Sequence, residues 1–333
     1  MAIIRPFIFT GSAGYLMRLI RGLRNVPEDF AGCVATIGNF DGLHLGHQNI
    51  LASLRAAGEA ERRPTLVMLF EPQPKEFFAP DSAPARLANF REKFLDLREA
   101  GVDYLLCLPF NEALRSMTAN DFIQQILVDA LKVKHLIVGD DFRFGCDRSG
   151  DYAALQAAGE HSGFIVEDTP THLISGERVS STRVRDVLSQ GDLVAAASLL
   201  GRPYRMSGRV AYGRQLGRTL DTPTANVLIK RRHLPMSGVF AVHVNVDSTG
   251  DEYVGVANLG VKPTIAGTPE PSLEVHLFGF KGNLYGQHLD VELLHRIRDE
   301  KKFSGLDELR AAINADKVAA QQYFAARPDS FRF

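Results

Sequence analysis

The sequence predicts two domains: an α/β domain with a parallel sheet, then a small antiparallel β-barrel with a C-terminal helix. The chain has 333 residues, which is more than one hydrophobic core usually contains. Its first half alternates strand-like and helix-like segments, whereas residues 205 to about 297 carry short alternating apolar runs between Gly, Pro, Asn and Asp. We therefore expect domains at 1–186 and 205–333, joined by a linker helix and connection at 187–204.

Four apolar runs in the first half have the length of buried strands, at residues 33–38, 64–70, 103–110 and 135–140. Amphipathic helix patterns separate them, at residues 47–63, 85–101 and 118–132. Gly101 suits the left-handed position after a helix, and Thr118 suits the N-cap of the next one. Strands joined in this way form right-handed crossovers and a parallel sheet, whose ligands bind at the carboxyl ends of the strands.

The second half begins with one further helix pattern, from residue 181 to 201. Short runs of alternating apolar residues follow, at residues 207–213, 237–246, 252–260, 273–280 and 289–298. Their spacing and the turn residues between them indicate the antiparallel strands of a small barrel. A final helix pattern covers residues 305–326.

Composition excludes several classes of protein. The formal net charge of −1 argues against a surface for nucleic acid. No apolar run approaches the roughly 18 residues needed to cross a membrane, and the N-terminal segment lacks the order of a signal peptide, so we expect a cytoplasmic protein. The three cysteines, Cys33, Cys107 and Cys146, form no CxxC pair, which favours reduced, buried thiols over disulfides or zinc.

The stretch TIGNFDGLHLGH at residues 36–47 contains two histidines, His44 and His47. A zinc site would need a further ligand, for which Asp41 is the only near candidate, and general-base catalysis fits the adjacent glycines poorly. A strand, a glycine-containing turn and a helix start also place free N–H groups at one point, and imidazole donors there would hold phosphate oxygens. Spacing alone leaves a fourth interpretation open, two ordinary surface histidines beside a turn.

The HxGH pattern resembles the signature of the adenylyltransferase superfamily of Rossmann-like nucleotidyltransferases. The longer string GNFDGLHLGHQNIL, with the blocks at 138–151 and 179–188, is similar to the FAD synthetase module of bacterial bifunctional riboflavin kinase/FMN adenylyltransferases. The resemblance implies catalytic roles for His44, His47 and Arg183. It implies nucleotide contacts from Gly38, Asn39, Phe40, Asp41, Gly42, Gly46, Ser180, Ser181 and Thr182.

Two further segments are candidates for the flavin side of this domain. Asp141 and Phe144 follow the strand at 135–140, where they are placed to contact a ligand or simply to form a turn. The string FEPQPKEFF resembles a family segment that contacts flavin, which implies roles for Phe70 and Pro72. Gln73 stands where that family commonly has a histidine.

Residues 208–227, GRVAYGRQLGRTLDTPTANV, contain no P-loop. The glycines suggest a loop that lies over phosphates, with Gly213, Gly217 and Arg218 as nucleotide contacts. Thr224 and Asn226 offer oxygen atoms of the kind that suits Mg²⁺ carried by ATP, although composition alone also fits a plain hairpin turn.

The string PTAN and the blocks at 255–264, 273–280 and 284–303 resemble the flavokinase domain. The resemblance implies that Thr224 and Asn226 hold the Mg-nucleotide, that Glu274 is the base for the riboflavin 5′-hydroxyl, and that Arg298 serves the flavin. By pattern alone Glu274 also fits an outward-facing strand residue. Asp221 and Thr222 stand where the family usually has glycine and an aromatic residue, and an acidic residue with a Cβ there is expected either to repel the phosphate or to constrain the loop.

These patterns together predict a bifunctional enzyme that makes FMN from riboflavin and ATP, then FAD and pyrophosphate from FMN and a second ATP. Its expected partners are ATP, riboflavin and FMN, with Mg²⁺ as cofactor and no nucleic acid or membrane. A homo-oligomer is compatible with the sequence. Three alternatives stay open. The first is an adenylyltransferase for pantetheine phosphate or nicotinate mononucleotide, and the second is an enzyme active only on supplied FMN whose β domain binds flavin or regulates. The third is a non-enzymatic flavin-binding or sensing protein with a degenerate kinase half.

Overall fold

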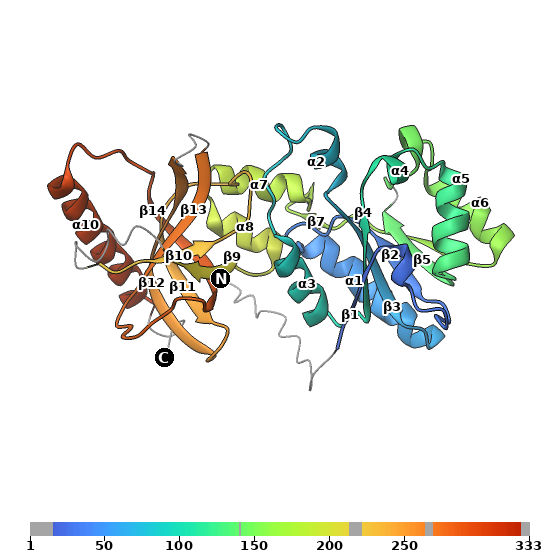
Figure 1. The fold of residues 1–333 in the computed structure, drawn as a ribbon, viewed down its shortest axis with the longest axis horizontal. Coiled ribbons are helices and arrows are strands. Elements are labelled where there is room, and N and C mark those ends of the chain that lie inside the picture. Colours follow the sequence, from blue (N-terminus) through green and yellow to red (C-terminus); the bar gives the residue numbers. More distant parts are fainter. Residues whose placement is uncertain (1–15, 140, 213–221, 264–268, 328–333) are drawn as a thin grey trace. The chain divides into compact units, whose positions relative to one another are not determined.

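The computed structural model describes residues 16–139, 141–212, 222–263 and 269–327 (Figure 1). The chain divides into two compact units. The first unit contains Met1–Pro84 and Lys93–Ser180, and the second contains Ala85–Glu92 and Ser181–Phe333. Each unit has its own sheet and its own site, and they are described separately.

The first unit is built on a six-stranded sheet in the order β1-β4-β3-β2-β5-β6, and every neighbouring pair is parallel. The strands are β1 (Arg18–Arg21), β2 (Val34–Ile37), β3 (Thr65–Glu71), β4 (Tyr104–Pro109), β5 (His135–Gly139) and β6 (Ile165–Thr169). The predicted parallel sheet and its four central strands are confirmed. The sequence did not predict β1 and β6, because these short edge strands are largely exposed and carry no apolar run.

Helices connect the strands of the first unit. They are α1 (Leu45–Glu61), α2 (Pro74–Phe78), α3 (Phe90–Glu99), α4 (Glu112–Arg115), α5 (Ala119–Asp121), the π-helix η2 (Phe122–Ala130) and α6 (Tyr152–Ser162). Thr118 accepts a hydrogen bond from the Asp121 N–H, as expected of an N-cap. Gly101 lies just beyond α3 with φ of +79°, also as predicted.

The prediction of one helix over 85–101 was wrong at its start. Residues before Phe90 are not helical, because Asn89 caps α3 by accepting a hydrogen bond from the Glu92 N–H at 3.0 Å. The carboxylate of Glu92 in turn accepts the Asn89 N–H at 2.6 Å, which completes a capping box. The segment Ala85–Glu92 belongs to the second unit, so the division between units falls within α3.

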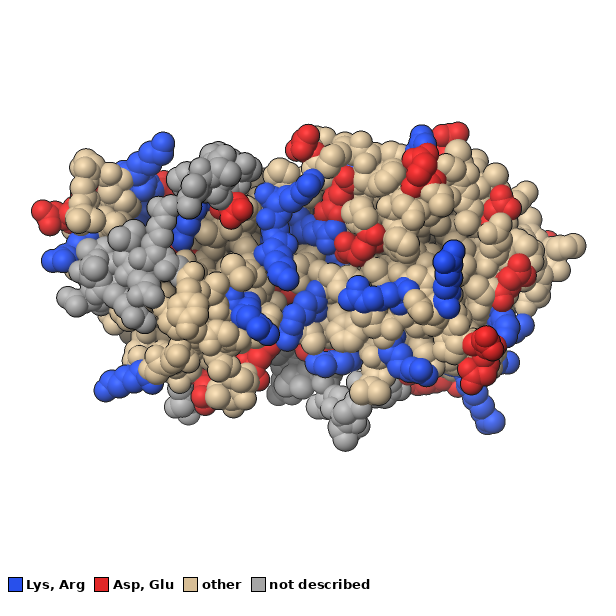
Figure 2. All heavy atoms as spheres, viewed as in Figure 1, with Lys and Arg blue, Asp and Glu red and all other residues tan. Residues whose placement is uncertain are grey.

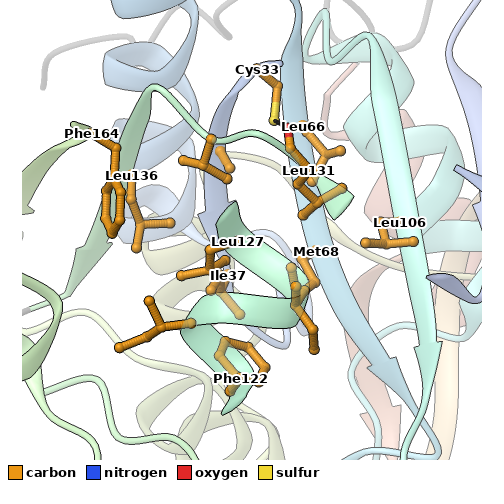
Figure 3. Close-up of a cluster of buried hydrophobic side chains, with 14 of the residues drawn as sticks. Cys33, Ile37, Leu66, Met68, Leu106, Phe122, Leu127, Leu131, Leu136 and Phe164 are labelled. Atoms are coloured by element: carbon orange, nitrogen blue, oxygen red, sulfur yellow. Dashed lines mark hydrogen bonds between the residues drawn. The ribbon is translucent and has the colours of Figure 1, made fainter. Parts of the chain in front are cut away.

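One hydrophobic cluster of the first unit lies between the sheet and η2. Figure 3 shows Phe122 and Leu127 of η2 directed at Ile37 and Met68 of the strands. Cys33 is also fully buried there, and burial raises the pKa of its thiol to about 12. All three cysteines are free, with Cys33 and Cys107 buried and Cys146 partly exposed. The expectation of buried thiols holds for Cys33 and Cys107 and was wrong for Cys146.

The second unit is a closed antiparallel barrel in the order β10-β13-β12-β11-β14-β9. Its strands are β9 (Tyr204–Ala211), β10 (Ala225–Leu228), β11 (Gly238–Val246), β12 (Asp251–Pro263), β13 (Pro269–Leu277) and β14 (His288–Arg298), followed by the helix α10 (Leu306–Ala325). The barrel and the C-terminal helix are confirmed. The sequence did not predict β10, whose four residues follow a turn-like TPT.

The single helix expected over 181–201 is two helices, α7 (Ser181–Ser189) and α8 (Leu193–Leu200). The break is at Gly191, whose φ of +77° is incompatible with a continuous helix. Asp192 then caps α8 by accepting the Ala195 N–H at 2.9 Å. Within the described residues no helix is both long and apolar enough to span a bilayer. Basic and acidic side chains are interspersed on the face shown in Figure 2.

Candidate active sites

The first candidate site lies where the strand order of the first unit reverses. From β2 the chain proceeds to β3 and β4 on one side, and later to β5 and β6 on the other. Parallel sheets bind ligands at such a switch point, outside the carboxyl ends of the strands. The histidine motif follows β2 and the 138–151 block follows β5, so the two segments share this edge, as the sequence indicated.

His44 is the N-cap of α1. Its Nδ1 accepts a hydrogen bond from the backbone N–H of His47 at 3.3 Å. A neutral ring bonded in this way carries its proton on Nε2. The imidazoles of His44 and His47 stack with centroids 3.7 Å apart and an angle of 15° between the rings. Because α1 has 17 residues, its N-terminal N–H groups also favour an anion at this place.

His47 is held in its neutral form. Burial, together with the charges of His44 and Lys93, lowers the pKa of His47 well below its usual range. The Phe40 ring packs beside it, with centroids 4.9 Å apart. Within the part of the chain that the structure describes, His47 Nδ1 has no hydrogen-bond partner. A buried ring nitrogen without a partner is suited to bind a polar ligand.

The loop from β2 to α1 has an unusual backbone. Phe40, Gly42 and Leu43 all have positive φ, at 45°, 84° and 44°, a region that residues with a side chain rarely adopt. Phe40 and Asp41 are buried, at 1% and 2% exposure. Strain of this kind persists where the surrounding structure fixes it, which is common at ligand sites.

Gly46 packs closely against its neighbours. A Cβ at this position would lie 3.2 Å from His44 Nδ1 and 3.4 Å from the carbonyl oxygen of Val179. The same segment contacts α1 again, because His172 Nδ1 lies 2.8 Å from Asn49 Nδ2. Ser180 therefore follows a stretch of chain that packs on the first turns of α1, beside the histidines.

The remaining nucleotide candidates lie in different places. Gly38 follows β2 directly, and its N–H donates to the Met68 carbonyl at 3.1 Å, while Asn39 is exposed in the same loop. Ser181, Thr182 and Arg183 form the first turn of α7 in the second unit, so their contact with nucleotide stays a prediction. No cluster of three or more His, Cys, Asp or Glu that could hold a metal occurs among the described residues.

The flavin candidates of the first unit differ in exposure. Asp141 is 61% exposed and pairs with Arg178 at 2.8 Å, and the hydrogen bond from that guanidinium lowers the pKa of the Asp141 carboxyl. Phe144 is only 7% exposed and packs in the core against Phe122 and Phe142. Its contact with flavin stays a prediction, and its visible role is packing.

An aromatic cluster stands at the carboxyl ends of β3 and β4. It contains Phe70, Phe77, Phe78 and Phe110, with the other three rings 5.3 to 5.9 Å from Phe110. Phe78 is 60% exposed. The exposed Pro72 lies in the same segment. The sequence analysis singled out Phe70 but missed the other three rings. Phe77 and Phe78 end the string FEPQPKEFF, and Phe110 ends the strand predicted at 103–110.

Gln73, the departure from the family pattern, has a structural role. It is the N-cap of α2, its backbone N–H donates to the Glu76 carboxylate at 3.0 Å, and the two residues form a capping box. Gln73 is buried, at 9% exposure. The substitution thus preserves a defined start for the helix that carries Phe77 and Phe78.

The second candidate site is a cavity of about 870 Å³ in the second unit. Thr224, Asn226, Glu274 and Arg298 all line it, so four residues singled out in the sequence converge on one space. Asn226 on β10 and Asn258 on β12 are the direct cross-strand neighbours of Glu274 on β13. Cross-strand neighbours share a face of the sheet, so these polar groups form one row.

Glu274 faces the cavity. Leu273 and Val275 on either side of it are each 1% exposed, and alternation along the strand puts Glu274 on the opposite face. Its carboxylate forms an ion pair with the ammonium of Lys262, which also donates to Asn226 Oδ1 at 3.1 Å. Sequence reasoning missed Lys262, because nothing in the string GVKPT distinguishes it from an ordinary surface lysine.

Arg298 is fixed by the C-terminal helix. Its Nε and Nη2 each donate to one carboxylate oxygen of Asp316 on α10, both at 2.8 Å. The guanidinium also lies over the ring of Phe303, 5.6 Å from its centroid. A bidentate pair of this kind is rigid, so the Arg298 guanidinium is held in one position at the edge of the cavity that it lines.

A smaller cavity of about 340 Å³ adjoins the same residues. Thr224 and Asn226 line both cavities, and Phe280 and Tyr285 line the smaller one. Two substrates in the two cavities would meet at Thr224 and Asn226. Gly213, Gly217, Arg218 and Asp221 lie outside the described residues, whereas Thr222 is buried with its hydroxyl 3.3 Å from Lys317 Nζ.

Comparisons with known proteins agree with both halves of this description. Residues 26–183 match FAD synthetase and residues 200–324 match riboflavin kinase. A bifunctional riboflavin kinase/FMN adenylyltransferase of Pseudomonas fluorescens is 52% identical over 305 residues, covering 92% of this chain and 97% of the relative. The Escherichia coli K12 protein of the same description is 49% identical over 312 residues, with 92% and 98% coverage.

A solved structure shares the fold. A crystal structure described as a macrolide-efflux protein from Streptococcus pneumoniae is 29% identical, with a TM-score of 0.76, and the match covers 92% of this chain and 98% of that one. The similarity extends over both units, as it does for the curated relatives. The resemblance seen in the sequence motifs is thereby confirmed, and the chain belongs to the family of bacterial bifunctional riboflavin kinase/FMN adenylyltransferases.

Proposed function

We propose that this chain phosphorylates riboflavin to FMN with ATP in its second unit, and adenylylates FMN to FAD with release of pyrophosphate in its first unit. The observation that carries the proposal is the convergence of Thr224, Asn226 and Glu274 on one cavity, in a chain whose first unit has the HxGH histidines at its switch point. Family membership supports both reactions.

In the kinase reaction, the larger cavity takes riboflavin, because Glu274 lines that cavity and not the smaller one. The Glu274 carboxylate orients the 5′-hydroxyl and accepts its proton as the γ-phosphoryl group transfers. The smaller cavity takes the nucleotide. Thr224 and Asn226, which line both cavities, are the residues at which the γ-phosphate meets the hydroxyl.

The residues at this point fit a magnesium ion carried by ATP. Their side chains offer oxygen atoms, the ligands that Mg²⁺ prefers, and Asn226 Oδ1 already accepts a cation, the ammonium of Lys262. The Thr224 hydroxyl and the Asn226 amide oxygen would hold the ion. Bound there, magnesium supplies neutralisation of the phosphate charge.

In the adenylyl transfer, a phosphate oxygen of FMN attacks the α-phosphorus of ATP, and the bond to the leaving pyrophosphate breaks. His44 donates from Nε2, since its Nδ1 is committed to the His47 N–H. Neutral His47 and the N-terminal N–H groups of α1 add donors for the oxygens on which charge develops. The resemblance also implies a guanidinium from Arg183 for phosphate oxygens, which stays a prediction because Arg183 belongs to the second unit.

The flavin in the first unit rests against the aromatic cluster. The rings of Phe70 and the exposed Phe78 offer flat apolar surface at the edge where the histidines also lie. Asp141, ionised through its pairing with Arg178, offers a carboxylate to a donor on the flavin. We further propose that the enzyme is cytoplasmic.

The test is a time course. The purified protein is incubated with riboflavin, ATP and Mg²⁺, and the flavins are separated by chromatography. FMN followed by FAD is expected. FAD from supplied FMN, with none from riboflavin, would refute the kinase half and favour a flavin-binding or regulatory barrel. Sedimentation of the same preparation shows whether the protein is a homo-oligomer.

A further inference from the structure

Lys262 places a cation between two residues of the proposed kinase site. Its ammonium group is paired with the carboxylate of Glu274 and donates to Asn226 Oδ1. Glu274 is the proposed base, and Asn226 is a proposed ligand of the magnesium that accompanies ATP. The ammonium therefore contacts oxygen atoms that the reaction itself requires.

The strand register shows that Glu274 is not the carboxylate directly opposite Lys262. Lys262 lies directly opposite Glu270, whereas Glu274 lies opposite Asn258, four residues earlier on β12. The lysine side chain thus extends along the strand, past Gly260, to reach the row formed by Asn226 and Glu274. Its ammonium contacts the Glu274 carboxylate on β13 and the Asn226 amide oxygen on β10. A bound metal ion needs the same arrangement, with oxygen atoms from two strands close together.

A magnesium ion and this ammonium compete for the same atoms. Both are compact cations that bind carboxylate and amide oxygens, and two cations beside one oxygen repel each other. The Lys262 side chain is 46% exposed. Exposed ion pairs contribute little to stability, so the side chain can move when a doubly charged ion arrives with its nucleotide.

We propose that Lys262 is a positioning residue of the kinase, whose ammonium occupies the cation position in the metal-free enzyme and moves aside when Mg-nucleotide binds. This inference rests on the proposed riboflavin kinase function. Before binding, Lys262 neutralises Glu274 and holds it beside Asn226. After binding, its flexible side chain carries the ammonium toward the phosphate oxygens.

The test measures metal dependence of binding, without turnover. A fluorescent ADP analogue, mant-ADP, is bound to the full-length protein while free Mg²⁺ is titrated, in the wild type and in K262M, K262R and K281M. The first unit contributes equally in all four proteins, because every substitution lies in the second unit. K281M removes the same charge from an exposed lysine that contacts neither cavity.

We expect K262M to lower the half-saturating Mg²⁺ concentration by about threefold or more, because the competing cation is gone. K262R keeps a cation and should stay within about twofold of the wild type. K281M should match the wild type. An unchanged or raised Mg²⁺ requirement in K262M overturns the proposal, and so does an equal fall in K281M, which would show an effect of overall charge.

Two controls keep the outcomes separate. Hydrogen exchange of barrel peptides checks that the second unit of K262M is folded, and K262Q replaces it if the methionine variant does not accumulate. FMN formation from riboflavin by the wild type is measured in parallel. Its absence would refute the proposed kinase function, whereas the Mg²⁺ dependence tests the role of Lys262.

Discussion

The carboxylate of Glu92 and the guanidinium of Arg231 form a buried ion pair in the second unit. Arg231 Nη2 lies 2.6 Å from Glu92 Oε2, and the two side chains are 0% and 4% exposed. The other oxygen, Oε1, accepts the backbone N–H of Ser207 on β9 at 2.6 Å. Glu92 comes from the short segment Ala85–Glu92, so a piece of the N-terminal half completes the barrel unit.

The first prediction concerns this pair. Removing one partner leaves a buried charge, so E92Q should destabilise the barrel by about 3–5 kcal/mol. The double variant E92M/R231M should recover part of this loss, because neither charge remains. The chain has no tryptophan, so the measurement is hydrogen exchange of barrel peptides across a urea series.

The neighbouring residue provides a matched control. Arg91 pairs with Asp247 at 3.1 Å, but these side chains are 46% and 37% exposed. R91A should therefore change stability by less than about 1 kcal/mol. If E92Q and R91A had equal effects, burial of the Glu92 pair would not be what stabilises the barrel.

The second prediction separates the two roles of His44. H44A should reduce FAD formation from FMN by about 10²–10³-fold, because a donor to the transferring phosphate is lost, and should also remove the cap of α1, at about 1 kcal/mol. H44N keeps a capping oxygen but not the ring. It should restore stability and leave the reaction slow, as followed by chromatography of FAD and by thermal unfolding.

Riboflavin phosphorylation is the internal control for these variants, since it takes place in the barrel. FMN formation should continue at the wild-type rate in both. Normal FAD synthesis by H44N would show that the histidine acts only as a helix cap.

The third prediction concerns Glu274. E274Q keeps the shape of the side chain but cannot accept the proton of the 5′-hydroxyl, so FMN formation should fall by about 10²–10⁴-fold. FAD formation from supplied FMN should be unchanged. E252Q, elsewhere on the barrel, serves as the control for charge. A kinase rate within a few-fold of wild type in E274Q would exclude general-base catalysis by this residue.

The fourth prediction is a pH dependence of stability. His243 lies between Glu292, 3.1 Å from its Nδ1, and Glu252, 3.5 Å from its Nε2. The hydrogen bond to Glu292, together with the charges of both carboxylates, raises the pKa of His243. A raised folded-state pKa means that the stabilisation is complete below the unfolded pKa of about 6.5 and is lost as pH rises through the folded value.

The contribution of His243 to the stability of the barrel should therefore be lost as the pH is raised from 6 to 8, so the wild type should lose more stability than H243Q over the same interval. Urea unfolding at a series of pH values measures both slopes. Equal slopes would mean that His243 has the same pKa in the folded and unfolded states.

The sequence predicted those parts of the fold that have a strong local pattern. The apolar runs at 33–38 and 135–140 were predicted to be strands, and the structure has β2 and β5 there. The histidine motif lies at the predicted edge of the sheet. The edge strand β1 escaped prediction because its partners, and not its own residues, define it. The start of α3 escaped because Asn89 overrides the apolar period that continues upstream of it.

The candidate sites show the same division. Thr224, Asn226 and Glu274 were found through family motifs, and the barrel brings them together. Family motifs did not find Lys262 or the rings of Phe77 and Phe110. Lys262 reaches Glu274 only through the pairing of β12 with β13, and the two rings meet only when distant segments pack together. A single lysine or phenylalanine carries no local signal for such long-range neighbours.

The contribution of Ala85–Glu92 to the barrel has a consequence for how this protein can be divided and recombined. A gene fragment encoding only the residues from Ser181 onward would omit the carboxylate that neutralises Arg231. Exchanging kinase halves between relatives by a single crossover would pair a barrel with a foreign Ala85–Glu92 segment. To transfer the second unit whole, a recombinant chain must be joined at three places, after residues 84, 92 and 180. The barrel and the segment Ala85–Glu92 must therefore come from the same parent.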